Sequence, residues 1–305
     1  MHAFFWVSIR TTTEILFKKN MKIIKTKPDL QVEIESIKSS GKTIGFVPTM
    51  GALHNGHKSL VDRCVAENDY CIVSIFVNPT QFNNLNDLEK YPRNLKQDAD
   101  FLERAGCRII FAPEPSEIYE TNELNAPFEF DFGGLDTVME GKFRPGHFNG
   151  VVQIVSKLFR LVQPDKAYFG EKDFQQLAII HRMLKIMNLS VEIIDCPIVR
   201  EPSGLALSSR NERLTADQRK KAVEISKVLS ESRNFAAQLS PVELTTWVID
   251  LINLVPGLEV EYYEIVNTTS LQTVYSWSEP SIGCVVVYCG EVRLIDNIKY
   301  KIIDN

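Results

Sequence analysis

The chain has 305 residues, 44% of them hydrophobic and 24% charged, which is enough apolar material for a packed core and excludes a disordered chain. This length suits about two domains. The formal net charge of −5 excludes the strongly basic composition typical of nucleic-acid coats and membrane-surface proteins, although a local basic pocket for a small anion is compatible with it.

Residues 1–20 stand apart from the rest of the chain. They contain an apolar segment, but no Lys or Arg precedes it and no small-residue cleavage site follows, so a secretory signal is not expected. Met21 opens a segment, Met-Lys-Ile-Ile, that is typical of a native start. We therefore expect residues 1–20 to be a mis-assigned start or a disordered extension.

From residue 43 onward, segments typical of strands and of helices alternate. Strands are predicted over 43–47, 71–77, 108–111, 167–169 and 191–196. Helices are predicted from His57 and over 94–105, 150–162 and 173–187. The helix over 150–162 is apolar on nearly every side and should be buried. This alternation predicts an α/β fold with a Rossmann-like, doubly wound parallel sheet over residues 21–197.

After Pro197 the pattern changes. Helices over 215–235 and 241–255 are followed by strands over 259–266, 284–289 and 292–295, which predicts a smaller C-terminal α+β domain over residues 198–305. The six cysteines lie in apolar segments with no Cys-x-x-Cys pair, so we expect buried, reduced thiols in a cytoplasmic protein. No stretch of about 18 apolar residues occurs, so no membrane span is expected.

Ligands of parallel sheets bind beyond the carboxyl ends of the strands, and the loop after the first strand contains His54-Asn55-Gly56-His57. A helix begins there, and its free N–H groups and partial positive charge suit a phosphate. Imidazoles at this place can donate hydrogen bonds as charge develops on phosphate oxygens. The alternative is a pair of surface histidines at a helix cap. A zinc site lacks a third ligand.

Two further segments carry possible phosphate donors. In Gly170-Glu171-Lys172-Asp173, between a strand and a helix, Lys172 can neutralise a phosphate and Asp173 can cap the helix. An ordinary helix entry would explain the acidic residues equally well, but not the lysine. In Leu207-Ser208-Ser209-Arg210, hydroxyl groups and a guanidinium form a compact donor set, with a solvated surface loop as the alternative.

Four polar residues near strand ends or helix starts are candidates for substrate binding. Gln81 and Gln176 suit hydroxyl and carboxylate groups because an amide both donates and accepts. His147 follows Arg144-Pro145-Gly146 at the start of the buried helix, a good position for an anion.

Together, these segments resemble the pantoate–β-alanine ligase (pantothenate synthetase) family of the His-x-Gly-His nucleotidylyl-transferase superfamily. The resemblance runs from Met21 to the end of the chain. Its matching segments, in order, are 48–57, 78–82, 91–93, 144–148, 170–176, 199–201, 207–211 and 294–297.

The resemblance implies an enzyme of pantothenate and coenzyme A biosynthesis. ATP and pantoate would give pantoyl adenylate and pyrophosphate, and β-alanine would then attack the adenylate to release pantothenate and AMP. The resemblance also implies Mg²⁺ as the ion that accompanies ATP, a cytoplasmic homodimer, and closure of the two domains to exclude water. It implies no nucleic-acid or membrane partner.

The resemblance implies roles for single residues as well. The catalytic group would be His57, His54, Lys172 and Arg210. The ATP-binding residues would be Met50, Gly51, Ala52, Leu53, His54, Asn55, Gly56, His57, Gly170, Glu171, Lys172, Asp173, Val199, Leu207, Ser208, Ser209 and Arg210. The ligands of pantoate and β-alanine would be Gln81, Gln176, His147 and Arg144. Asp98 stands where the family has an acidic residue near the phosphates, and is the candidate metal ligand.

Three alternatives fit the sequence less well. An adenylyltransferase acting on a phosphate-bearing acceptor would need a cationic subsite where this chain has Gln81 and Gln176. A class I aminoacyl-tRNA synthetase is disfavoured by the acidic net charge and by the lack of a tRNA-binding extension. A nucleotide-binding regulator without catalysis would not need both histidines, Lys172 and Arg210.

Overall fold

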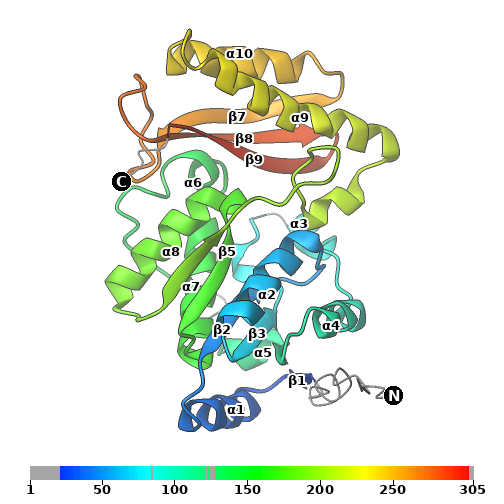
Figure 1. The fold of residues 1–305 in the computed structure, drawn as a ribbon, viewed down its shortest axis with the longest axis vertical. Helices are drawn as coiled ribbons and strands as arrows, with labels where there is room; N and C mark the ends of the chain where they lie inside the picture. Colours follow the sequence, from blue (N-terminus) through cyan, green and yellow to red (C-terminus); the bar gives the residue numbers. More distant parts are fainter. Residues whose placement is uncertain (1–20, 84, 121, 124–127, 302–305) are drawn as a thin grey trace, which may run out of the picture.

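A six-stranded parallel sheet forms the core of the lower part of the molecule in the computed structural model (Figure 1). The structure describes residues 21–83, 85–120, 122–123 and 128–301, so the expectation for residues 1–20 lies outside it. In the order β1-β4-β3-β2-β5-β6, every neighbouring pair is parallel. The strands are β1 (Lys22–Ile24), β2 (Ile44–Thr49), β3 (Tyr70–Ile75), β4 (Ile109–Phe111), β5 (Lys166–Gly170) and β6 (Glu192–Cys196). The predicted α/β fold with a doubly wound parallel sheet is confirmed.

Helices cover both faces of this sheet, because side chains alternate along each buried strand. In β2, Ile44 and Phe46 pack with α1 (Lys27–Ser39), α7 (His147–Val162) and α8 (Phe174–Met187). Val47 packs on the opposite face with α2 (Asn55–Glu67) and α4 (Leu95–Arg104). The predicted burial of α7 is confirmed, since apolar residues on nearly all its sides are buried.

The chain changes direction in the sheet between β2 and β5. From β2 it continues to β3 and β4 on one side, and it returns to β5 and β6 on the other side. Only Gly45–Lys166 and Phe46–Ala167 are paired between β2 and β5, so the carboxyl ends of these two strands are not hydrogen-bonded to each other. In open α/β sheets this switch point is where ligands bind. The segments after Thr49 and Gly170 therefore border one crevice.

A second unit lies above this crevice in Figure 1. Its antiparallel sheet is made of β7 (Leu258–Asn267), β8 (Ser281–Cys289) and β9 (Val292–Lys301), and α9 (Ala216–Phe235) and α10 (Pro241–Asn253) cover one face. The predicted smaller α+β domain is confirmed in its elements. The boundary at residue 197 stays a prediction.

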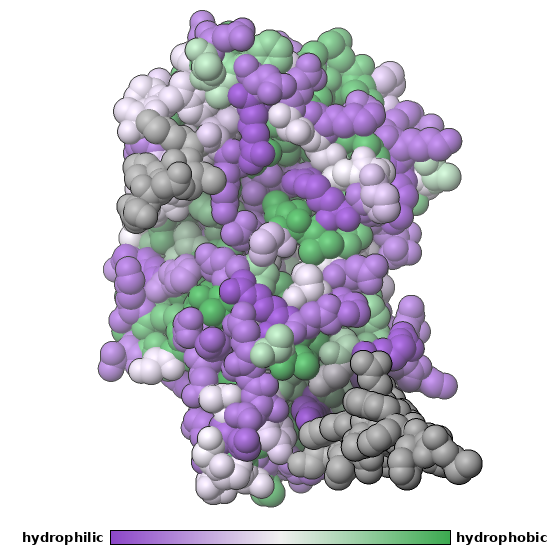
Figure 2. Space-filling view, viewed as in Figure 1, coloured by the Kyte–Doolittle hydropathy of each residue, from purple (hydrophilic) through white to green (hydrophobic). Residues whose placement is uncertain are grey.

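The other face of the small sheet packs on the first unit. Tyr262, Ile282 and Cys284 form one apolar cluster with Met139 of the first unit, and Phe174 packs against this cluster. In the same view as Figure 1, the surface is mostly hydrophilic, and hydrophobic side chains are exposed between the two units (Figure 2).

Polar contacts complete the junction between the units. Arg293 of β9 donates to both oxygens of Glu140, at 2.9 and 2.6 Å. Burial alone would raise the pKa of Glu140, but the hydrogen bonds and charge of Arg293 outweigh it and lower this pKa to about 2. The Arg293–Glu140 pair therefore attaches the small sheet to the first unit. Within the second unit, Asp296 of β9 accepts two bonds from Arg200, at 2.6 and 2.8 Å, which fix the segment after β6 to the small sheet.

Several elements were not predicted from the sequence. Two of them, β1 and α1, precede residue 43. The others are short: α3 (Leu85–Glu89), α5 (Pro115–Ile118), α6 (Met139–Phe143), and the 3₁₀ turns η1 (Pro79–Gln81), η2 (Glu171–Asp173) and η3 (Ser209–Arg213). No helix among the described residues is long and apolar enough to span a bilayer. All six cysteines are free and buried, as predicted.

Replacement of Gly45 by alanine should destabilise the large sheet. A Cβ at this position would lie 2.5 Å from both Cys64 Sγ and Asn68 Nδ2, so α2 would have to shift away from β2. We expect the free energy of unfolding to fall by about 1–3 kcal/mol, measured by urea denaturation. Gly170→Ala is the control for stability, because a Cβ there meets open space. Equal stability of the two variants would contradict the close packing of α2 on β2.

Candidate active site

Two histidines fix the turn between β2 and α2. His54 is the N-cap of α2, and its Nδ1 accepts a hydrogen bond from the backbone N–H of Gly56 at 3.1 Å. His57 Nδ1 accepts in turn from the backbone N–H of His54 at 3.3 Å. This is a reciprocal capping box, which more commonly uses Ser or Thr with Glu or Gln. Both histidines thus cap the helix, as the alternative interpretation had it, but both rings also line a cavity.

The capping bonds decide which ring nitrogen carries hydrogen. A nitrogen that accepts from a backbone N–H holds a lone pair, so each neutral ring is protonated on Nε2. Burial and the charge of Lys172 lower the pKa of His54 to about 4. Burial, followed by His54 and Lys172, holds the pKa of His57 well below its usual range. At neutral pH both rings are therefore uncharged Nε2–H donors.

Asp98 of α4 clamps the loop that precedes the histidines. Its two carboxylate oxygens accept from the backbone N–H groups of Ala52, at 3.0 Å, and Leu53, at 2.8 Å. Gly51 and Ala52 both have positive φ angles, of 81° and 51°, so this turn is strained for ordinary residues. The clamp offsets that strain and shapes the entry to α2.

The predicted role of Asp98 as a metal ligand is not supported by this geometry. Both oxygens are bonded to backbone amides, and Asp98 does not line the cavity. Throughout the described part of the chain, no group of three or more His, Cys, Asp or Glu side chains is placed to hold a metal ion.

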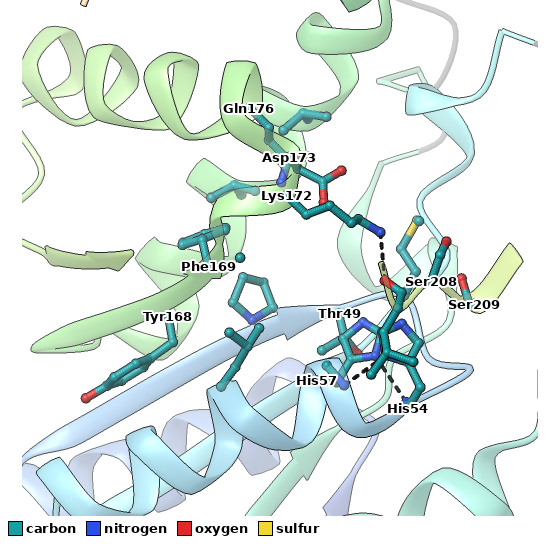
Figure 3. A pocket seen from close by; sticks show the side chains of 18 of the residues that line it. Thr49, His54, His57, Tyr168, Phe169, Lys172, Asp173, Gln176, Ser208 and Ser209 are labelled. Carbon is teal, nitrogen blue, oxygen red and sulfur yellow. Dashed lines mark hydrogen bonds between the residues drawn. The ribbon is translucent and has the colours of Figure 1, made fainter. Parts of the chain in front are cut away.

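The second side of the site is η2, which follows β5. Lys172 Nζ reaches across the crevice and donates to the carbonyl of Leu207 at 3.1 Å (Figure 3). Asn297 of β9 donates from Nδ2 to the carbonyls of Glu171, at 2.8 Å, and Lys172, at 3.1 Å, and so holds η2 in place. The prediction that the Asp173 side chain caps α8 is wrong, because it makes no capping bond and lines the cavity instead.

The second unit supplies the third side through η3. Ser208 is the N-cap of η3, and its Oγ accepts from the backbone N–H of Arg210 at 3.3 Å. Ser209 Oγ lies 3.4 Å from the hydroxyl of Tyr91, which belongs to the first unit. The segment predicted as either a donor set or a solvated loop is therefore packed over the crevice.

These three sides enclose a cavity of about 240 Å³. Figure 3 shows Lys172 pointing toward the histidines and Ser208 from the opposite wall. The predicted residues that line this cavity are Met50, His54, Gly56, His57, Gln81, Gly170, Lys172, Asp173, Gln176, Val199, Leu207, Ser208, Ser209 and Arg210. The predicted residues that do not line it, or the smaller one beside it, are Gly51, Ala52, Leu53, Asn55, Asp98 and Glu171.

A smaller cavity of about 80 Å³ adjoins the first and shares Lys172, Gln176 and Arg210 with it. The predicted pair Arg144 and His147 line this second cavity. Burial and the charge of Arg144 lower the pKa of His147 to about 3, so its ring is neutral. Its Nδ1 lies 2.8 Å from the carbonyl of Gln81 and its Nε2 lies 3.2 Å from Arg144 Nη1. The neutral ring thus donates from Nδ1 and accepts at Nε2.

Some residues that shape the site were not singled out from the sequence. Asn78 is buried and donates to the carbonyl of Gly150 at 3.0 Å, while its Oδ1 accepts from the Tyr119 hydroxyl at 2.7 Å, which fixes η1 against α7. Asn297 holds η2 as described above. Asn78 follows the apolar run that begins in β3, and Asn297 lies within β9. In both places an amide departs from an apolar pattern, and this was the available signal.

Comparison with known proteins supports one family. The model of the family described as pantoate-beta-alanine ligase matches residues 22–299. The chain belongs to the pantoate-beta-alanine ligase family. Pantothenate synthetases of Bacteroides thetaiotaomicron and Bacteroides fragilis are 57% and 56% identical over 283 residues, which is 92% of this chain and 99% of each relative.

Solved structures of the ligase family share the fold. Pantothenate synthetase from Thermus thermophilus superposes with a TM-score of 0.86 at 39% identity, covering 92% of this chain and all of that chain. Pantoate-beta-alanine ligase from Francisella tularensis, complexed with beta-gamma ATP and beta-alanine, gives a TM-score of 0.78 at 37% identity, covering 93% and 99%.

The low pKa of His54 makes stability depend on pH. Between its usual value of 6.5 and about 4, the unfolded chain binds a proton at His54 that the native state does not, so the free energy of unfolding falls as pH falls. His54→Asn keeps a good N-cap residue and removes this group. Over that window its free energy of unfolding should fall less steeply than that of the natural chain, by up to about 1.4 kcal/mol per pH unit. Equal slopes in urea denaturation would contradict the buried neutral ring.

Removal of the clamp should loosen the loop before α2. Asp98→Ala leaves the N–H groups of Ala52 and Leu53 without their acceptor, and the free energy of unfolding should fall by about 1–3 kcal/mol, with weaker ATP binding in calorimetry. Asp98→Glu is the conservative control that retains the charge. Loss of Mg²⁺ dependence with unchanged stability and ATP affinity would instead support a metal role for Asp98.

Proposed function

We propose that this chain condenses pantoate with β-alanine to give pantothenate, using ATP and passing through pantoyl adenylate. Membership of the ligase family and the high identity over nearly the whole chain support this activity. The observation that carries it is the larger cavity at the switch point, where the His-x-Gly-His turn, η2 and η3 meet.

The phosphates of ATP lie between the three donor segments in this proposal. The Nε2–H groups of His54 and His57 donate to phosphate oxygens from one wall, and Lys172 Nζ contributes a positive charge from the other. Ser208 and Arg210 donate from the second unit, and Val199 contacts adenine. Cationic and N–H donors around phosphate stabilise the crowded, charged transition state of adenylation.

Pantoate and β-alanine occupy adjoining parts of the two cavities. Gln81 and Gln176 line the larger cavity beside the histidines, where their amides bind the hydroxyl and carboxylate groups of pantoate. Arg144 and His147 line the smaller one, where a guanidinium suits the carboxylate of β-alanine. The Francisella tularensis relative was solved in complex with beta-gamma ATP and beta-alanine, which supports the proposal that this chain binds both kinds of ligand.

Two bond exchanges make up the reaction. A carboxylate oxygen of pantoate attacks the α-phosphorus, and the bond to the β-phosphate oxygen breaks to release pyrophosphate. The amine of β-alanine then attacks the carbonyl carbon, the bond from this carbon to the AMP oxygen breaks, and the amine loses a proton. The chain contributes chiefly by alignment of the reactants and by stabilisation of charge. His57 acts as a neutral hydrogen-bond donor, which agrees with its strongly lowered pKa.

Magnesium fits this site as an ion that arrives with the triphosphate. Asp173 is the one carboxylate among the described residues that line the larger cavity, so it is the candidate to hold the ion, alone and without a protein cluster. When bound, Mg²⁺ screens the charge of the leaving pyrophosphate.

Location in the cytoplasm and assembly as a homodimer belong to the same proposal. The free state of all six cysteines is compatible with a reducing compartment. Light scattering of the purified chain measures the assembly directly.

Exchange of labelled pyrophosphate into ATP tests the adenylate. With Mg²⁺ and pantoate, but without β-alanine, the purified chain should catalyse this exchange, because formation of the adenylate is reversible. Exchange should disappear when pantoate is omitted. Tight ATP binding without exchange would contradict the proposal and indicate another acceptor or a non-catalytic nucleotide binder.

Removal of the His57 ring should affect chemistry more than binding. His57→Ala should slow pantoate-dependent exchange by about 10²–10³-fold, while ATP affinity falls much less, because the ring acts mainly on charge that develops in the transition state. His181→Ala on α8 is the control, since this histidine is exposed and lies outside both cavities. Equal losses of exchange and affinity would assign His57 to ground-state binding.

A further inference from the structure

A carboxylate of the first unit lies between two arginines of the second. Asp87 of α3 accepts from Arg210 Nη2 at 2.9 Å through Oδ2, and from Arg213 Nη1 at 3.1 Å through Oδ1. The three side chains are only 24–28% exposed. Asp87 was not singled out from the sequence, and it lines neither cavity.

The place of Asp87 in the chain links the two substrate regions. The segment 79–91 begins with η1, which carries Gln81, continues through α3, and ends at Tyr91. Gln81 and Tyr91 both line the larger cavity. Asp87 and Tyr91 each contact η3, through the arginines and through Ser209. The segment that borders the pantoate region therefore supports the segment that borders the phosphate region.

The charge of Asp87 is secure at neutral pH. Burial would raise its pKa, but the charge and hydrogen bond of Arg210, with the charges of Arg213 and Arg144, outweigh burial and lower it. Asp87 is thus an anionic acceptor that faces cationic groups from η3 and from the end of α6.

The bond to Asp87 leaves Arg210 able to bind a ligand. A guanidinium has five N–H donors in one plane, and Asp87 engages Nη2 alone. Arg210 also lines both cavities. A long side chain fixed at one nitrogen loses less freedom when its other donors bind an anion.

We propose that Asp87 is a positioning residue for Arg210, orienting its guanidinium toward the nucleotide phosphates and so coupling the position of α3 to adenylation. This inference rests on the proposed phosphate role of Arg210. Asp87 could instead compete with ATP for Arg210, and the two possibilities predict opposite changes in ATP affinity when the carboxylate is removed.

A double-mutant cycle tests the coupling. The variants are Asp87→Asn, Arg210→Lys and the double variant, measured by pantoate-dependent pyrophosphate exchange and by ATP binding in calorimetry. Asp87→Asn should slow exchange about tenfold without tightening ATP binding. In the Arg210→Lys background the same change should cost less than about twofold, because the group it orients is already lost. Asp87→Glu should restore part of the rate.

Two controls separate orientation from general stability. Asp217→Asn removes an exposed carboxylate that pairs with Lys221 on the surface of α9 and should leave exchange unchanged. Arg213→Gln removes the other partner of Asp87 but keeps the bond to Arg210, and should change exchange by less than about twofold. If Arg213→Gln is as slow as Asp87→Asn, the bridge merely anchors η3 and the proposal is overturned.

The remaining outcomes overturn it as clearly. If the fold-losses in exchange rate of Asp87→Asn and Arg210→Lys multiply in the double variant, the two residues act independently. Tighter ATP binding by Asp87→Asn would show competition. Unchanged exchange in Arg210→Lys would refute the phosphate role of Arg210 itself. If Arg210→Lys slows exchange but Asp87→Asn does not, only the positioning role of Asp87 is refuted.

Discussion

The site depends on the capping bonds that His54 and His57 accept at the start of α2. Each Nδ1 accepts a backbone N–H at the start of α2, so the rings help to fold the turn that presents them. The same bonds fix the tautomer and leave Nε2–H as the donor. Burial and the positive charge of Lys172 then keep both rings neutral. One local constraint thus connects helix initiation, ring orientation and protonation state.

The topology puts this turn where it can act. Because the carboxyl ends of β2 and β5 are not hydrogen-bonded to each other, the histidine turn and η2 face one another across a crevice. The second unit covers that crevice, and its attachment is polar. Asn297 bonds to the carbonyls of η2, and Arg293 joins β9 to Glu140. In the proposed reaction, a site bordered by both units limits the access of water to the acyl adenylate, which water can hydrolyse.

Much of the fold could be predicted from the sequence, because long periodic segments report burial directly. The apolar run of β3 and the nearly all-round apolar α7 are examples. Short elements such as α3 and α6 were missed because five residues span too few turns for a periodic pattern. β9 extends to Lys301, whereas the predicted strand ends at Ile295. The prediction stops there because Asp296 and Asn297 break the apolar pattern. Both side chains bond to partners that are far away in the sequence.

The segments that border the candidate site could be predicted from the sequence, whereas the bonding partners of single carboxylates could not. Motifs at strand ends identified the three segments that meet, since topology brings such ends together. The role of a carboxylate depends on its bonding partners, and these cannot be predicted from the neighbouring residues in the sequence. Asp98 bonds to backbone amides across the loop, Asp173 leaves α8 uncapped, and Asp87 meets η3 from another unit. These contacts join residues that are distant in sequence or depend on side-chain rotamers.

Nitrogen NMR of the side chains in ¹⁵N-histidine-labelled protein tests the central claim most directly. The chain has five histidines, so replacement of His54 and His57 in turn by Asn would assign their signals. We predict a non-protonated Nδ1 and a protonated Nε2 for both rings, with no titration of either near pH 6.5 and a transition of His54 only near pH 4. Protonated Nδ1 atoms, or titration of both rings near their ordinary pKa, would contradict this prediction.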